Sequence, residues 1–175
     1  MSIRTFKGVV PNLGDRVMVD ASAVVIGDVE IDADSSIWPT CSIRGDVNLI
    51  RIGERTNIQD GTVIHVSHRF PGLPDGNATY IGNDVTVGHK VMLHGCMLED
   101  LCLIGMGSIV LDGAIIRSKV LLGAGSLVPE GKVLEGGYLW LGRPAKKVRE
   151  LTEEEMKYFQ YSASHYVKLK NDYLT

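Results

Sequence analysis

Aromatic residues are scarce in this chain of 175 residues, at 6% of the sequence, although hydrophobic residues make up 45% of it. No uninterrupted run of about 18 apolar residues occurs, so nothing predicts a helix that crosses a membrane. Residues 1–4 show no apolar core of a secretion signal. We therefore expect a soluble, cytoplasmic protein without a membrane partner, whose core is built from small aliphatic side chains.

Cysteine is also rare, and the three cysteines, Cys41, Cys96 and Cys102, form no Cys-x-x-Cys pair. This spacing argues against a structural zinc site made of thiolates and favours buried, reduced thiols that act as small hydrophobic residues. Basic runs are lacking, and the net charge is -3. The sequence therefore predicts no nucleic-acid partner.

Glycine, by contrast, is abundant at 20 residues, and an aliphatic residue recurs every six positions. This period fits neither a helix nor an array of hairpins, but three such units close one triangular coil of a parallel β-helix. The aliphatic side chain points into the prism, a small residue fills the narrow interior, and a frequent glycine relieves the corner. Coils stack about 4.8 Å apart, and the visible units predict roughly five of them. The aliphatic positions are Val19, Val25, Ile31, Ile37, Ile43, Leu49, Ile52, Ile58, Ile64, Ile81, Val87, Leu93, Leu98, Ile104, Val110, Ile116, Leu122 and Val128.

The predicted fold class is an all-β solenoid, a parallel β-helix with one C-terminal helix, in a single domain over residues 1–175. The β-helix should span about 14–135, with a loop over 67–79 where proline and glycine interrupt the period. Thr152 and Glu155 have the spacing of a capping box, which predicts a helix over 152–173. Its apolar residues recur at steps of three and four, so one face should pack along the prism.

Two histidines fall in the same outward slot of neighbouring coils. If the units at Ile52, Ile58 and Ile64 form faces one, two and three of the prism, His65 and His94 stack on face three, about 4.8 Å apart. Two imidazoles at that spacing can each place a nitrogen about 2.0 Å from one Zn²⁺. We therefore predict that His65 and His94 are metal ligands.

A third histidine, His89, lies on face two, and the outward directions of two sides of a prism diverge. We expect His89 to reach the same ion only from a neighbouring subunit, which predicts a homotrimer with metal sites at its subunit interfaces. Three histidines with one open position suit catalytic Zn²⁺, and Fe²⁺ or Co²⁺ would also accept them. The alternative is that these histidines only decorate a solvated face. His68, at the start of the loop, is a weaker candidate for the site.

Four polar side chains surround the predicted metal site. Arg44 occupies the slot of His65 one coil below, and Asp46 follows two residues later, so the pair can cross the subunit boundary or orient an anion. The alternative is a purely structural salt bridge. Asp60 stacks beneath His89 and can fix its tautomer, and Gln59 can orient a metal-bound hydroxide. Asn57 is interpreted as a turn or ladder residue.

The motifs that hold these side chains are Ile43-Arg44-Gly45-Asp46, Asn57-Ile58-Gln59-Asp60-Gly61, Ile64-His65 and Gly88-His89-Lys90-Val91-Met92-Leu93-His94-Gly95. Together they resemble the γ-class carbonic anhydrase family, in particular its small bacterial branch, and the similarity extends from about Gly14 to Tyr173. The resemblance implies a left-handed winding, a homotrimer, and a metal bound by His65 and His94 of one chain and His89 of the next. It also implies roles for Arg44 and Asp46 at the subunit interface and for Gln59 near the metal-bound water. The implied reaction is the reversible hydration of CO₂ to bicarbonate by zinc hydroxide.

The sequence departs from the most active members of that family in its loop, where residues 69–76 offer one carboxylate in place of a glutamate-rich proton shuttle. His165, on the predicted helix, is a hypothesised proton relay, because histidine exchanges protons readily near neutral pH. A solvated helix histidine is the plainer interpretation. Two other functions stay open: a metal-binding or scaffold protein with little turnover, and an acyltransferase, since residues 142–146 are shared with acyltransferases of the same repeat.

Overall fold

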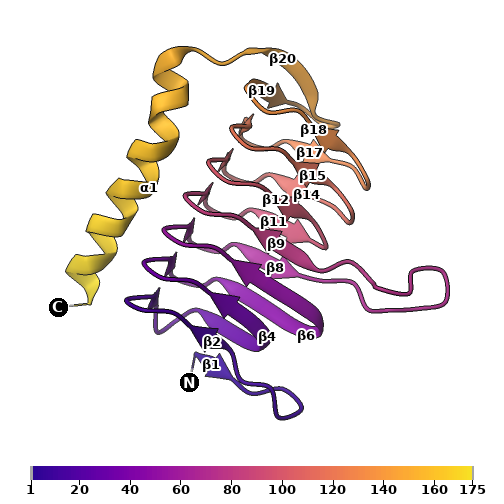
Figure 1. The fold of residues 1–175 in the computed structure, drawn as a ribbon, viewed down its shortest axis with the longest axis vertical. Helices are drawn as coiled ribbons and strands as arrows, with labels where there is room; N and C mark the ends of the chain where they lie inside the picture. Colours follow the sequence, from indigo (N-terminus) through magenta and orange to yellow (C-terminus); the bar gives the residue numbers. More distant parts are fainter. Residues whose placement is uncertain (1, 175) are drawn as a thin grey trace.

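The computed structural model describes residues 2–174 and shows the chain wound into stacked coils, with one helix running alongside them (Figure 1). The winding is a left-handed parallel β-helix, which confirms the predicted fold class. Face three consists of β1 (Ile3–Arg4), the first parts of β4 (Val24–Ile31) and β6 (Ser42–Ile52), β8 (Val63–His65), β11 (Met92–His94), β14 (Ile109–Val110) and β17 (Leu127–Val128).

The strands β4 and β6 turn a corner of the prism, so their second parts continue on face one. The other strands of face one are β2 (Asn12–Leu13), β9 (Thr79–Ile81), β12 (Met97–Leu98), β15 (Ile115–Ile116) and β18 (Val133–Leu134). Face two consists of β3 (Met18–Val19), β5 (Ser36–Ile37), β7 (Asn57–Ile58), β10 (Thr86–Val87), β13 (Leu103–Ile104), β16 (Leu121–Leu122) and β19 (Tyr138–Leu141). The antiparallel strand β20 (Lys146–Glu150) pairs with β19 and ends the stack. The prism is therefore taller than the roughly five coils expected, because β1 and β2 at one end and β18 and β19 at the other also stack.

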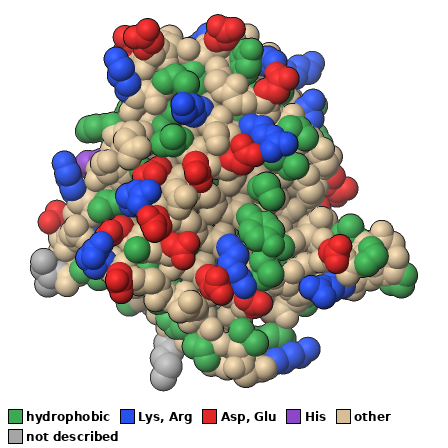
Figure 2. Space-filling model, in the orientation of Figure 1, with side chains coloured by type: hydrophobic (Ala, Val, Ile, Leu, Met, Phe, Trp, Pro, Cys, Tyr) green, Lys and Arg blue, Asp and Glu red, His purple; other side chains and the backbone are tan. Residues whose placement is uncertain are grey.

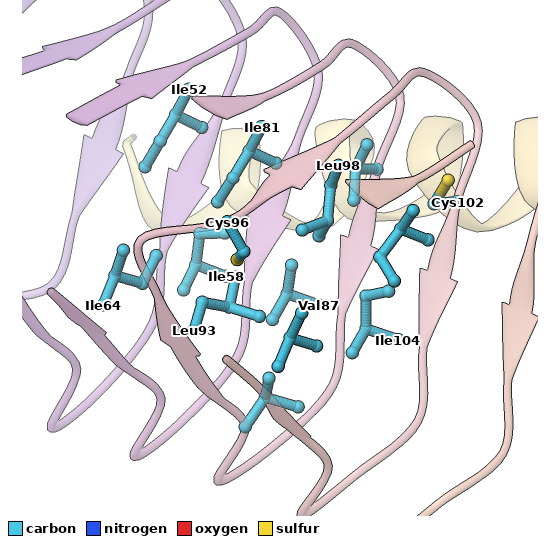
Figure 3. Packing of buried hydrophobic residues seen from close by; sticks show 14 of the residues in the cluster. Ile52, Ile58, Ile64, Ile81, Val87, Leu93, Cys96, Leu98, Cys102 and Ile104 are labelled. Atoms are coloured by element: carbon cyan, nitrogen blue, oxygen red, sulfur yellow. The ribbon is translucent and has the colours of Figure 1, made fainter. Parts of the chain in front are cut away.

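Ladders of aliphatic side chains fill the prism, as the period predicts. On face three, Ile43 pairs with Ile64, Ile64 with Leu93 and Leu93 with Val110, and all four are fully buried. Figure 3 shows the corresponding residues of all three faces meeting in the interior. Full burial of one such side chain contributes about 1.5–3 kcal/mol, so the ladders are the main source of stability.

One expected core position is wrong. Leu49 is only half-buried, and the fully buried neighbour is Ile50, which pairs with Val29. The register passes from Gly27–Gly45 to Val29–Ile50, so β6 holds extra residues at the corner between faces three and one. The insertion therefore precedes Ile50 and does not follow Leu49.

The recurrent glycines serve a purpose other than the one expected. The left-handed backbone at the corners falls two residues after these glycines, on side-chain-bearing residues such as Asp84 (φ 55°) and Lys90 (φ 56°) and on other glycines such as Gly107 (φ 67°). Gly82 does not have a positive φ, but a Cβ there would lie 2.3 Å from the Asp100 carboxylate of the next coil. The slot after the aliphatic residue is thus kept free of a side chain by the close approach of the next coil.

The cysteines are buried, as predicted, and they share the interior with small and β-branched side chains. Burial raises the pKa of Cys41 to about 11 and the pKa values of Cys96 and Cys102 to about 12. The thiols are therefore protonated at neutral pH.

The helix α1 (Glu153–Tyr173) runs along face two, where it packs against β3, β5 and β10 (Figure 1). Thr152 and Glu155 form the expected capping box. Phe159 and Ala163 point inward with Ser162 between them. Lys170, near the end of α1, is fully buried, and its ammonium lies 3.1 Å from Asp34 Oδ1. Within residues 2–174, no helix is both long and apolar enough to span a membrane.

The outer surface carries interspersed charges, and the face drawn in Figure 2 shows acidic and basic side chains side by side with hydrophobic ones between them. Arg51, for example, bridges Asp28 at 2.8 Å and Glu30 at 3.1 Å. The loop expected at residues 67–79 leaves the prism as an extended arm (Figure 1), with antiparallel bridges that join Ser67 to Asn77 and Phe70 to Leu73.

Candidate metal centre

His65 and His94 lie side by side on face three, at the ends of β8 and β11. The register pairs them directly, as the repeat predicts, because Ile64 and Leu93 immediately before them are paired in the core. His65 Nδ1 lies 3.2 Å from His94 Nε2. Both side chains are partly exposed, at 21% and 31%, so a solvent ion can reach these nitrogens.

A carboxylate holds the far nitrogen of each ring. Asp46 Oδ1 lies 3.0 Å from His65 Nε2, and Asp112 Oδ2 lies 2.9 Å from His94 Nδ1. Because an ionised carboxylate only accepts hydrogen bonds, each ring must carry its proton on the nitrogen that faces the carboxylate. The two nitrogens that face each other, His65 Nδ1 and His94 Nε2, then both present lone pairs.

Two lone pairs at this distance repel each other unless a cation lies between them. Two nitrogens that each bind one tetrahedral Zn²⁺ at about 2.0–2.1 Å are about 3.3–3.4 Å apart. The observed 3.2 Å between His65 Nδ1 and His94 Nε2 is close to that separation. The two nitrogens are therefore placed as two ligands of one metal ion would be, and the carboxylates orient both rings.

Arg44 forms an ion pair with Asp46 within the chain. Burial raises the pKa of Asp46, but hydrogen bonds from His65 and from the Arg44 guanidinium outweigh burial and hold that pKa below its usual value. Asp46 therefore stays ionised and keeps its role as an acceptor for His65. The Arg44 side chain is partly exposed, at 44%, so it can also meet a neighbouring molecule.

His89 does not join this pair in the single chain. Its Nδ1 lies 3.0 Å from Asp60 Oδ2, as the stacking of Asp60 beneath it predicts, and its side chain is 45% exposed. This contact leaves Nε2 available to another partner. Within residues 2–174 of one chain, no group of three or more His, Cys, Asp or Glu side chains is arranged to hold a metal.

A pocket of about 280 Å³ lies beside His89, between face two and α1. Its lining includes Gln59 and His89, together with Tyr158 and Tyr166 of the helix. Gln59 is almost buried, and its Nε2 donates a hydrogen bond of 3.0 Å to Asn57 Oδ1. The structure thus places Gln59 and His89 at one cavity, and it makes Asn57 a buried ladder residue that touches Gln59.

The two remaining histidines lie outside these contacts. His68 is exposed on the arm, where its ring lies 5.7 Å from that of Phe70. His165 is exposed on α1, stacked on Tyr161 at 6.1 Å and edge-on to Tyr166 at 5.7 Å. Because Tyr166 lines the pocket, only the Tyr166 ring separates His165 from the cavity of Gln59 and His89.

Sequence reasoning missed Asp112 and Ser67. Asp112 binds His94 through Oδ2 and accepts a hydrogen bond of 2.7 Å from Ser67 Oγ through Oδ1, so it ties the base of the arm to the histidine pair. Asp112 follows His94 by one coil, but a missing residue in the repeat shifts the register at Leu98. Counting with that deletion places Asp112 next to the slot of His94, and this is the signal that could have identified it.

The sequence of this chain is similar to those of known proteins. A probable carbonic anhydrase of Methanocaldococcus jannaschii is 51% identical over 157 residues, which cover 90% of this chain and 94% of that protein. The mitochondrial γ carbonic anhydrase 2 of Arabidopsis thaliana is 46% identical over 162 residues, or 91% of this chain and 57% of the plant protein. No model of a protein family matches the chain.

Among solved structures, a hexapeptide transferase family protein from Anaplasma phagocytophilum superposes with a TM-score of 0.91 and 43% identity, over 98% of this chain and 97% of that one. The name of that protein refers to a transferase, whereas the relatives above are named carbonic anhydrases. The degree and extent of identity to those carbonic anhydrases establish that the chain is a member of the γ-class carbonic anhydrase family.

Proposed function

We propose that the protein catalyses the reversible hydration of CO₂ to bicarbonate and a proton at a metal held between subunits. One observation carries this proposal: His65 Nδ1 and His94 Nε2 face each other at 3.2 Å, with Asp46 and Asp112 fixing both rings. Such a pair of unprotonated nitrogens is a preformed part of a metal site. The names of the related proteins supply the reaction.

The third ligand in this proposal is His89 of a neighbouring subunit. Asp60 orients its ring in the same way as the other two carboxylates orient theirs, which leaves Nε2 free to bind. Because one chain lacks a complete ligand set among its described residues, closure by a three-fold axis is the simplest way to complete it. A homotrimer with three equivalent interfacial sites follows.

His65 and His94 of one chain and His89 of the next would hold the metal, and a Zn²⁺ there would supply water acidic enough, with a pKa of about 7, to attack CO₂ at neutral pH. Three imidazoles would also suit Fe²⁺ or Co²⁺. Gln59 lines the cavity beside His89 and orients the oxygen that attacks CO₂. The partly exposed guanidinium of Arg44, paired with Asp46, attracts the bicarbonate anion. The proton released in the reaction leaves through His165 and the pocket edge formed by Tyr166.

The test is stopped-flow CO₂ hydration by protein loaded with Zn²⁺ and, anaerobically, with Fe²⁺. Hydration that disappears with the chelated protein and with His94→Ala supports the proposal. A metal-loaded protein without any hydration activity would instead be a metal-binding or scaffold protein.

The transferase in the name of the Anaplasma protein is the reason to test a second function. The assay is acetyl transfer from acetyl-CoA to a panel of amines and alcohols, followed as release of free CoA thiol. We expect none, because Asp46 and Asp112 hold the two rings with their free nitrogens facing each other, where neither can act as a general base on an acceptor. Transfer in the absence of hydration would replace the proposal.

A further inference from the structure

A row of buried polar side chains runs from Gln59 across face two to the helix. Gln59 Nε2 lies 3.0 Å from Asn57 Oδ1, and Asn57 Nδ2 lies 3.1 Å from Thr86 Oγ1. Thr86 Oγ1 lies 2.8 Å from Ser162 Oγ on α1. The exposed fractions are 6% for Gln59, 1% for Asn57, 6% for Thr86 and 5% for Ser162, so water cannot substitute freely for any of these bonds.

The orientation of both amides in this row is determined by a backbone carbonyl. Asn57 Nδ2 also lies 3.4 Å from Val85 O, which can only accept a hydrogen bond. The amide nitrogen of Asn57 must therefore face Val85 and Thr86, and its oxygen must face Gln59. Gln59 must therefore donate to that oxygen through Nε2. At the other end of Asn57, the Thr86 hydroxyl accepts a hydrogen bond from Nδ2, so its own proton is available to donate to Ser162.

This direction leaves one group of Gln59 for the cavity, its carbonyl oxygen Oε1. The pocket that Gln59 lines also contains His89, so Oε1 is an acceptor beside a predicted metal ligand. An acceptor at this place binds the O–H of an attacking hydroxide or of bicarbonate, whereas an amide N–H there would not. Turning the amide over would set two oxygens, Gln59 Oε1 and Asn57 Oδ1, against each other in a buried position.

The last member of the row belongs to α1, which lines the same pocket through Ser162 and is fixed near both of its ends. The helix begins at its Thr152 capping box, and its other end is held by the ion pair of Lys170 with Asp34. Ser162 lies between the buried residues Phe159 and Ala163, so the docking of α1 places its hydroxyl on Thr86.

We propose that Thr86 and Ser162 are positioning residues that hold the Gln59 carbonyl oxygen toward the reacting oxygen. This inference rests on the proposed function for its kinetic consequence, but the row itself can be tested without any activity. A merely structural row would satisfy buried polar groups and stabilise the fold without changing turnover.

The kinetic experiment compares Thr86→Val, which keeps the shape of the side chain, with Thr86→Ser, which keeps the hydroxyl. We expect kcat to fall roughly five- to tenfold in Thr86→Val and Ser162→Ala, with KM little changed, and Thr86→Ser to recover most of it. Ser126→Ala is the matched control, because Ser126 is fully buried and its hydroxyl donates to Gly123 O, away from the row. Its kcat should equal that of the unchanged protein. Wild-type kcat in both Thr86→Val and Ser162→Ala, together with a loss in Gln59→Ala, would overturn the proposal.

A second measurement separates this proposal from the proposed function. In the ¹⁵N-labelled metal-free protein, the Gln59 side-chain amide protons should exchange slowly with solvent and should shift and exchange faster in Thr86→Val but not in Ser126→Ala. If the wild-type protein hydrates no CO₂, the proposed function fails, and the exchange rates alone decide the positioning role. Gln59 amide protons that are unchanged in both Thr86→Val and Ser162→Ala would refute that role even in an active enzyme.

Discussion

Asp112 Oδ2 lies 2.9 Å from His94 Nδ1 while its other oxygen accepts a hydrogen bond from Ser67. A single carboxylate thus sets the tautomer of one predicted metal ligand and fixes the base of the arm. Replacement of Asp112 by Asn, which keeps the shape, allows an N–H to face His94 and removes the preference for a free lone pair on Nε2. We expect metal affinity to fall by about 10- to 100-fold.

The measurement for Asp112→Asn is a competition titration of Zn²⁺ against a chelating dye. Ser67→Ala is the control, because it removes the arm contact and leaves the carboxylate on His94. Unchanged affinity in Asp112→Asn would mean that the carboxylate does not orient a ligand.

The second prediction concerns the origin of the third ligand. His89→Ala and His94→Ala proteins should each bind no metal tightly, because each lacks one ligand of every site. The His89→Ala chain keeps His65 and His94, and the His94→Ala chain keeps His89. In any mixed trimer of the two variants, one of the three subunit interfaces therefore has all three ligands. Mixed trimers should therefore bind about one third of the wild-type metal.

Such trimers can be purified after co-expression with two different affinity tags and measured by elemental analysis. A site built within one chain gives no metal in any mixture. The single variants, purified alone, set the background.

The repeat predicted the interior much better than the corners. The pairing of Ile64 with Leu93 and of His65 with His94 follows from counting in sixes, because every uninterrupted unit must stack on the one below. Counting failed where residues were added, near Leu49, but it placed the missing residue before Leu98 correctly, since Leu98 is buried and pairs with Ile81. Leu49 and Ile50 are both aliphatic, so the period alone could not tell which one points inward after an insertion.

The glycines show a different limit of the sequence. A glycine after the aliphatic residue suggests a left-handed turn, but the need at Gly82 is the close approach of Asp100 from the next coil. That contact joins residues one coil apart and depends on how tightly the coils stack. The relation of Gln59 to Ser162 was equally hidden, since the apolar period of the helix predicts its inward face but not which residue of the prism a polar side chain on that face meets.

The third prediction concerns the fully buried Lys170 and its partner Asp34. Asp34→Ala leaves the ammonium buried without a counter-charge, which should lower the free energy of unfolding by about 3 kcal/mol. Lys170→Met, which replaces the ion by an apolar chain of similar length, should cost much less. Urea denaturation at a fixed protein concentration measures both, and equal losses in the two variants would show that the charge pair is not the cause.

The fourth prediction is the pH dependence of this contact. Hydrogen bonds from Arg16 lower the pKa of Asp34, burial raises it, and Lys170 lowers it further, so the folded pKa lies below the usual value. The unfolded chain therefore binds a proton first as the pH falls. The contribution of Asp34 is fully present above about pH 4, near the unfolded pKa of an aspartate, and is lost as the pH falls through the folded value.

This pH effect is measured as the difference in free energy of unfolding between wild type and Asp34→Asn from pH 6 to pH 3. The difference should be constant at the upper end and shrink toward the lower end. A difference that stays constant over the whole range would mean that Asp34 does not titrate with folding.

The last prediction concerns His165, the candidate for proton export. It is exposed on α1 and edge-on to Tyr166, which lines the pocket of Gln59 and His89. If it carries protons to solvent, His165→Ala should lower kcat at low buffer concentration by about tenfold or more while leaving kcat/KM nearly unchanged, since proton transfer follows the hydration step. Imidazole added to the medium should restore the rate, and Lys168→Ala, an exposed change on the same helix, should have no effect. Buffer dependence identical to that of the unchanged protein would leave His165 as a solvated residue whose ring merely stacks on Tyr161.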